Sequence, residues 1–111
     1  MKIKTQNYGE VTVVQLQGDL DLDSAEFFKT NVTDIIAADR SSIVIDMSEV
    51  GSIDSVGLEH LLWARDSCDQ NKCQVRLAGL DDTCKKILEV TRLEDEFDCY
   101  DELAGAVKSF A

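Results

Sequence analysis

The chain has 111 residues, a length typical of one domain, so we expect residues 1–111 to form a single domain. Its 22 Asp and Glu residues outnumber its 11 Lys and Arg residues, and the formal net charge of −11 would repel the phosphates of a nucleic acid. Hydrophobic residues make up 44% of the chain, which is enough to form a core and argues against disorder.

Two N-terminal segments, residues 2–7 and 11–17, carry β-branched and alternating residues on either side of a glycine-containing turn and predict an antiparallel hairpin. A helix is expected next, with Asp23 as its N-cap and Glu26 three residues later, ending near Ala38. Its apolar residues recur at helical spacing: Ala25, Phe28, Val32, Ile35 and Ile36.

Residues 42–47 contain an apolar run without alternation, which is typical of a strand covered on both faces, and we expect it at the centre of the sheet. A turn containing Gly51 leads to a second helix, which is expected to begin at Asp54 or Ser55 and to end near Asp69. One face of this helix is apolar: Leu58, Leu61, Leu62 and Cys68.

A further strand is expected over residues 73–78, followed by a third helix that Asp81 can cap. The residues of this helix that we expect to face inward are Cys84, Ile87, Leu88 and Thr91. A short edge strand over residues 97–100 and a last helix over residues 101–109 complete the chain. This order predicts an α/β fold with a mixed sheet of four to five strands, in which parallel strands follow the hairpin, and about four helices.

Four cysteines, Cys68, Cys73, Cys84 and Cys99, are spaced too irregularly for the paired CxxC units of a zinc site. We interpret them as reduced thiols in the core, with a disulfide or a metal site as the alternative.

The longest apolar runs are four residues long, against the roughly 20 that a membrane-spanning helix needs. The first six residues alternate between polar and apolar and do not form the apolar core of a signal peptide. We therefore expect a cytoplasmic protein without membrane insertion, and the net charge favours a monomer.

An enzyme is not expected, because the candidate catalytic groups do not come together. Ser55 and His60 lie about 140° apart around a helix, so they cannot form a nucleophile and base pair. Asp46 lacks the neighbouring carboxylates that a magnesium-dependent phosphoacceptor needs, and we interpret it as capping a turn at Met47 and Ser48. The glycines never cluster into a phosphate loop, so we expect neither catalytic residues nor a bound cofactor.

The segment from Asp54 to Leu58 has two interpretations. In the first, Asp54 or Ser55 caps the helix that follows. In the second, the Ser55 hydroxyl is exposed to a kinase, Gly57 lets the backbone of another protein approach, and the loop with Asp19 and Asp21 lies alongside.

Val56, His60 and Trp63 lie opposite the apolar face of the second helix. They either pack against the third helix or form an exposed patch for docking, in which His60 would add mild pH sensitivity.

Three segments each carry a motif of a known family: residues 18–21 with Ser24 and Ala25, residues 43–48, and residues 53–58. They resemble the STAS domain family of anti-sigma factor antagonists, with its G-x-L-D…(S/T)-A segment, its D-L-S after the central strand, and its (M/I)-D-S-(S/T/A)-G-L signature. Residues 77–80 and 87–93 resemble the later strand and helix end of the family, where Arg92 stands in place of a frequent Gly.

The resemblance implies a partner switch. The unmodified protein would bind an anti-sigma factor that is an ATP-dependent serine kinase and thereby free a sigma factor, phosphorylation of Ser55 would release it, and a serine phosphatase would restore binding. The residues expected to contact the partner are Asp19, Asp21, Asp54, Ser55, Val56, Gly57, Glu59, His60 and Trp63.

A second branch of the family offers an alternative, in which a STAS subunit docks on the ATPase of an ABC-type lipid-transport complex. Glu59, His60 and Trp63 occupy positions where the sporulation-type antagonists usually carry small or aliphatic residues, so the identity of the partner stays open.

Overall fold

The computed structural model describes residues 1–110, which form one five-stranded sheet with four α-helices. The sheet order is β1-β2-β3-β4-β5, in which β1 and β2 are antiparallel and the other neighbours are parallel, so the predicted α/β fold is confirmed. The elements are β1 Lys2–Tyr8, β2 Val11–Gln17, α1 Leu22–Ala37, β3 Ser42–Glu49, α2 Ser55–Gln70, β4 Gln74–Ala78, α3 Asp82–Val90, a 3₁₀ turn Glu94–Glu96, β5 Asp98–Tyr100 and α4 Leu103–Lys108.

The predicted central strand is β3, which lies between β2 and β4. Its residues 43–47 are all buried because helices cover both faces of the sheet at this position. We had expected a turn at Met47 and Ser48, but the strand continues to Glu49. Asp46 Oδ1 nevertheless accepts a hydrogen bond from the backbone N–H of Ser48 at 3.1 Å.

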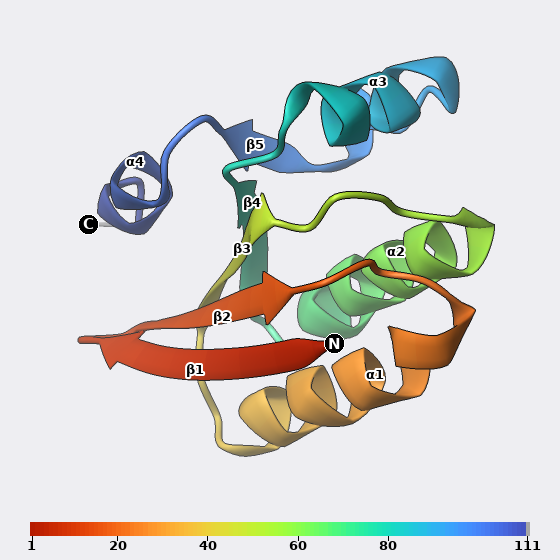
Figure 1. Cartoon of the computed structure of the whole chain (residues 1–111). Helices are drawn as coiled ribbons and strands as arrows, with labels where there is room; N and C mark the ends of the chain where they lie inside the picture. Colours follow the sequence, from red (N-terminus) through yellow and green to blue (C-terminus); the bar gives the residue numbers. More distant parts are fainter. Residues whose placement is uncertain (111) are drawn as a thin grey trace.

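The two faces of the sheet are covered unequally. On one face, α1 and α2 lie side by side, and α3 contributes Cys84 and Leu88 to the same large core (Figure 1). On the other face, the six-residue α4 is the only helix of residues 1–110 that packs against the sheet, over a small cluster that includes Val44 and Ala106. The sheet surface over β1 and β2 on that side is therefore partly open.

An aspartate caps each of the three longer helices at its N-terminus. The side chains of Asp21, Asp54 and Asp81 accept a hydrogen bond from the backbone N–H three residues later. The caps at Asp54 and Asp81 agree with the sequence prediction. The predicted cap at Asp23 is wrong, because α1 begins at Leu22 and its capping box joins Asp21 to Ser24.

Two expected core positions are exposed. Thr91 is the C-cap of α3 and is exposed. Its hydroxyl donates to Ile87 O at 2.7 Å, so the side chain does not face inward. Cys99 is exposed on the edge strand, whereas Cys68, Cys73 and Cys84 are buried free thiols. Burial raises the pKa of the Cys84 thiol to about 12, so that thiol stays protonated at neutral pH.

No helix within residues 1–110 is long and apolar enough to cross a membrane.

The α3 helix ends in a Schellman motif, in which Leu93 N–H donates to Leu88 O at 2.8 Å and Arg92 N–H donates to Glu89 O at 3.1 Å. Arg92 therefore adopts a left-handed conformation with φ of 59°. This geometry explains why a glycine would suit the position.

We predict that Arg92→Gly stabilises the protein by about 1 kcal/mol, because glycine has no Cβ to strain the left-handed backbone. Urea denaturation monitored by circular dichroism measures this gain. Arg92→Ala is the matched control, since it removes the same side chain and keeps the Cβ. An equal gain in both variants would assign the effect to the side chain and not to the backbone.

Candidate functional site

The loops that follow β2 and β3 pair with each other at the carboxyl end of the parallel strands. Leu20 and Ile53 form an isolated parallel bridge. Leu20 N–H donates to Ser52 O at 3.0 Å, and Asp54 N–H donates to Leu20 O at 3.2 Å. This pairing brings the N-termini of α1 and α2 together, so the loop with Asp19 and Asp21 lies alongside Asp54, as in the second of the two interpretations of this segment.

The carboxylate of Asp54 joins the two helices. Its Oδ1 accepts from Gly57 N–H at 2.8 Å and so caps α2. Its Oδ2 accepts from Leu22 N–H at 3.2 Å, the first residue of α1. Of the two residues considered for the cap, Asp54 has this role, and both of its oxygens are used.

Ser55 therefore does not cap α2. It is the first residue of α2 and is exposed. Its hydroxyl makes no side-chain hydrogen bond to another of residues 1–110. A hydroxyl in this position is open to solvent at the N-terminus of a helix, where a negatively charged group is tolerated.

Gly57 fits closely against the chain itself. A Cβ at this position would lie 2.1 Å from Leu20 O and 2.9 Å from Leu20 C. The expectation that Gly57 admits the backbone of another protein is thus wrong, because the β2–α1 loop already fills the space. The glycine serves the pairing of the two loops.

Further acidic residues lie on the β2–α1 loop and in α2. Asp19 is exposed, and its Oδ1 lies 3.4 Å from where a Cβ on Gly51 would stand. Asp21 is half-buried in its capping box, and Glu59 is exposed one turn along α2. Acidic side chains from both loops and from α2 thus share this edge of the molecule.

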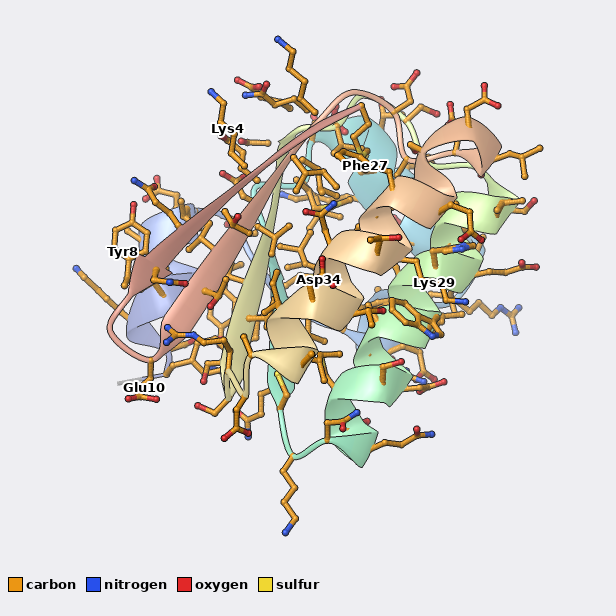
Figure 2. The ribbon with its side chains drawn as sticks, turned by 90° about the horizontal axis from the view of Figure 1, so that it is seen from below. Lys4, Tyr8, Glu10, Phe27, Lys29 and Asp34 are labelled. Atoms are coloured by element: carbon orange, nitrogen blue, oxygen red, sulfur yellow. The ribbon has the colours of Figure 1, made fainter. Side chains whose placement is uncertain are left out.

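Val56, His60 and Trp63 are all half-buried, so they form neither a core seam nor a fully exposed stripe. Trp63 packs against the core, and Lys29 Nζ lies 5.5 Å from the centroid of its ring. Figure 2 labels Lys29 on α1. The helix neighbour of Trp63 is therefore α1, and not the third helix that one of the two interpretations gave. His60 donates from Nδ1 to Val56 O at 2.9 Å within α2.

The distance along α2 separates these residues into two groups. Val56 adjoins Ser55, whereas Trp63 lies eight residues after Ser55, or about 12 Å from it along the helix axis. A partner centred on Ser55 would contact Val56 and Glu59 before it reaches Trp63.

Leu22 is a member of this surface that the sequence analysis did not identify. It is 68% exposed, a high value for a large apolar residue, and its backbone N–H binds Asp54. A Leu directly after an N-cap is a recognisable signal only when the cap is placed at Asp21. The misplaced cap at Asp23 concealed it.

Within residues 1–110, no three His, Cys, Asp or Glu side chains are placed to share a metal ion.

The comparisons with known proteins agree on one fold. The model of the STAS domain family matches residues 2–106. A proposed anti-sigma factor antagonist from Thermotoga maritima is similar with a TM-score of 0.90 and 21% identity, over 96% of this chain and 92% of that one.

Two further structures extend the comparison. A sulfate transporter family protein from Wolinella succinogenes has a TM-score of 0.81 and 19% identity, over 90% of this chain and 84% of that one. The Bacillus cell fate determinant SpoIIAA in its phosphorylated form has a TM-score of 0.76 and 16% identity, over 99% of this chain and 100% of that one. At these identities the likeness concerns the fold.

We predict that Asp54→Ala destabilises the protein by about 2 kcal/mol, because it removes the cap of α2 and the bond to Leu22 N–H together. Thermal and urea denaturation measure the loss. Asp54→Ser, which keeps one acceptor, should lose less. The control Glu59→Ala alters an exposed carboxylate of the same helix and should change stability by less than about 0.5 kcal/mol; an equal loss there would contradict the role of Asp54.

We also predict that Gly57→Ala costs about 2 kcal/mol or more, since the added Cβ would overlap Leu20 O. Urea denaturation again gives the free energy of unfolding. Gly105→Ala is the matched control, because a Cβ at that helical glycine would meet nothing closer than 3.9 Å, and alanine is the better helix former. If both variants were as stable as the wild type, the close approach of the loop would be disproved.

Proposed function

Because the chain belongs to the STAS domain family, we propose that it is an anti-sigma factor antagonist that works as a phosphorylation-controlled partner switch. In its unmodified form it binds an anti-sigma factor that is an ATP-dependent serine kinase, and a sigma factor is released. Phosphorylation of Ser55 ends this binding, and a serine phosphatase restores it. ATP and its metal ion belong to the kinase.

The free hydroxyl of Ser55 is the observation that carries this proposal. The neighbouring Asp54 holds both helix N-termini, so a modification of Ser55 breaks no hydrogen bond of the fold. Asp54 has a structural role, and Ser55 is available for regulation.

The local charges explain why the phosphorylated chain would stay folded. A phosphate adds about 1.5 to 2 negative charges near Asp54 and Asp19. Between exposed groups this repulsion is screened by salt, and the N-terminus of α2 offsets part of it. Phosphorylation is therefore expected to change binding far more than folding.

The free energy needed to release a partner comes from desolvation. A change from mostly bound to mostly free takes about 3 to 5 kcal/mol of differential affinity. Burying a dianion without a matching charge in an interface costs several kcal/mol, which is enough. The switch thus requires the partner to cover Ser55.

The surface around Ser55 indicates what this partner presents. Leu22, whose backbone N–H bonds Asp54, and Val56, which follows Ser55, offer apolar area, and the exposed Asp19 and Glu59 add negative charge on the same two elements of the site. A complementary partner covers Ser55 with an apolar contact and keeps its Lys or Arg side chains at the rim, so a phosphate on Ser55 would be buried without a matching charge.

We predict that a purified anti-sigma factor kinase from the same organism transfers one phosphate from ATP to this chain, and that Ser55→Ala abolishes the transfer. Intact-mass spectrometry measures it. Ser52→Ala is the matched control, since Ser52 is an exposed serine of the same loop. Phosphorylation of Ser55→Ala at the wild-type level would refute Ser55 as the acceptor.

Binding tests the second half of the proposal. Ser55→Glu should weaken capture of the kinase by at least about 100-fold, whereas Ser55→Ala should bind as the wild type does. If Ser55→Glu and Ser55→Ala bind with equal affinity, there is no switch at this residue. A transporter ATPase that binds both variants equally would instead support a STAS subunit of a lipid-transport complex.

A further inference from the structure

Cys68 and Cys73 occupy two matched positions at the end of α2. The helix ends in a Schellman motif, in which Cys73 N–H donates to Cys68 O at 2.8 Å and Lys72 N–H donates to Asp69 O at 3.4 Å. Lys72 has the left-handed backbone that this motif needs, with φ of 58°. The motif lies at the opposite end of α2 from Ser55, the first residue of the helix.

The backbone hydrogen bond brings the two cysteines within reach of a disulfide. Ordinary bond lengths and angles on either side of that 2.8 Å bond place the Cα atoms of Cys68 and Cys73 at most about 6 Å apart. Disulfides usually join Cα atoms that are about 4.4 to 6.8 Å apart. The separation in the folded chain therefore suits a disulfide between these two residues.

The two side chains also meet in the core. Cys68 is 1% exposed and Cys73 is 3% exposed. The hydrogen bond between the two thiol groups lowers the pKa of Cys73 and raises the pKa of Cys68. Cys73 is thus the nucleophile of the pair, because the thiolate reacts and the thiol does not.

The motif itself does not require thiols. At the end of α3, Leu93 N–H donates to Leu88 O, so Leu88 and Leu93 hold the positions that Cys68 and Cys73 hold in α2. Contact between two apolar side chains is the usual way to pack these positions. The two thiols of α2 therefore add a chemical property that packing does not need.

A small oxidant can reach the pair from the surface. Residues 69–72 are all exposed, and so is Gln74 on the other side of Cys73. The thiols thus lie directly beneath a turn at a helix end, where hydrogen bonds open more readily than in the middle of a helix. Opening of this turn gives access to Cys73.

We propose that Cys68 and Cys73 are a redox-active pair that a peroxide converts into an intrachain disulfide. The Cys73 thiolate attacks one oxygen of hydrogen peroxide, so that a sulfenic acid forms on Cys73 and hydroxide leaves. The Cys68 sulfur then attacks the sulfenic sulfur, the S–S bond forms, and a second hydroxide leaves. The protons of the two thiols convert both hydroxides to water. The two sulfurs are oxidised and the peroxide is reduced, and a dithiol reductant reverses the change by exchange.

The other two cysteines lack this arrangement. Cys84 S–H donates to Val50 O at 3.4 Å, and burial raises its pKa to about 12, so it stays protonated. Cys99 is exposed on β5, and its own oxidation is what the experiment must separate from that of the pair. The pair uses no residue of the surface around Ser55, so the failure of this proposal would leave the proposed function untouched.

Peptide mapping of the oxidised chain tests the proposal. The folded chain is treated with hydrogen peroxide, the remaining thiols are blocked with iodoacetamide in urea, and the product is digested with trypsin. Trypsin cleaves after Lys72, between the two cysteines, so a disulfide holds peptides 66–72 and 73–76 together until dithiothreitol is added. We expect these linked peptides from wild-type protein whose amide NMR spectrum stays dispersed during the treatment. Linkage only after the chain has unfolded, or oxidation of Cys99 while both cysteines of the pair stay alkylated, would overturn the proposal.

Variants separate the roles of the two sulfurs. In Cys68→Ser the sulfenic acid on Cys73 has no second thiol to resolve it, so dimedone should label Cys73. In Cys73→Ser, labelling of Cys68 should be at least about 10-fold lower. Cys99→Ser is the matched control and should form the linked peptides as the wild type does. Equal labelling of Cys68→Ser and Cys73→Ser would refute Cys73 as the attacking thiol, and if either variant fails to fold, the peptide maps of the wild type and of Cys99→Ser decide.

Discussion

The pairing of Leu20 with Ile53 is the constraint on which the rest of the candidate site depends. It joins two loops that lie more than thirty residues apart in the chain. The loops can approach this closely because position 57 is a glycine, since a Cβ there would overlap Leu20 O. Once the loops are joined, the carboxylate of Asp54 reaches the N-termini of both α1 and α2. The orientation of the two helices and the exposure of Ser55 follow from that contact.

In the proposed switch, stability and regulation depend on adjacent residues. Asp54 bonds the N-termini of α1 and α2, whereas Ser55 forms no side-chain hydrogen bond within residues 1–110. A charge added to Ser55 meets the tolerant end of a helix in the free protein and a closed interface in a complex. The proposed switch therefore depends on the partner for most of its energy.

Local patterns in the sequence were sufficient for much of this description. The run without alternation identified β3 as the central strand, because a strand covered on both faces must be apolar throughout. The cap at Asp81 was correct, and Asp54 was one of the two candidates for the cap of α2, because each bond joins residues only three apart. The segment alone left open whether Ser55 caps the helix or is exposed, and the structure decided this by giving the cap to Asp54.

The sequence by itself thus determined the order of the elements, the central strand and the cap at Asp81, and it limited the cap of α2 to Asp54 or Ser55. Only the tertiary structure decided that Asp21 caps α1, that Leu20 fills the space at Gly57 and that Trp63 faces α1. Each of these depends on which segments meet across the sheet or between helices. Contacts between residues far apart in sequence leave no periodicity or spacing in the chain from which they could be inferred.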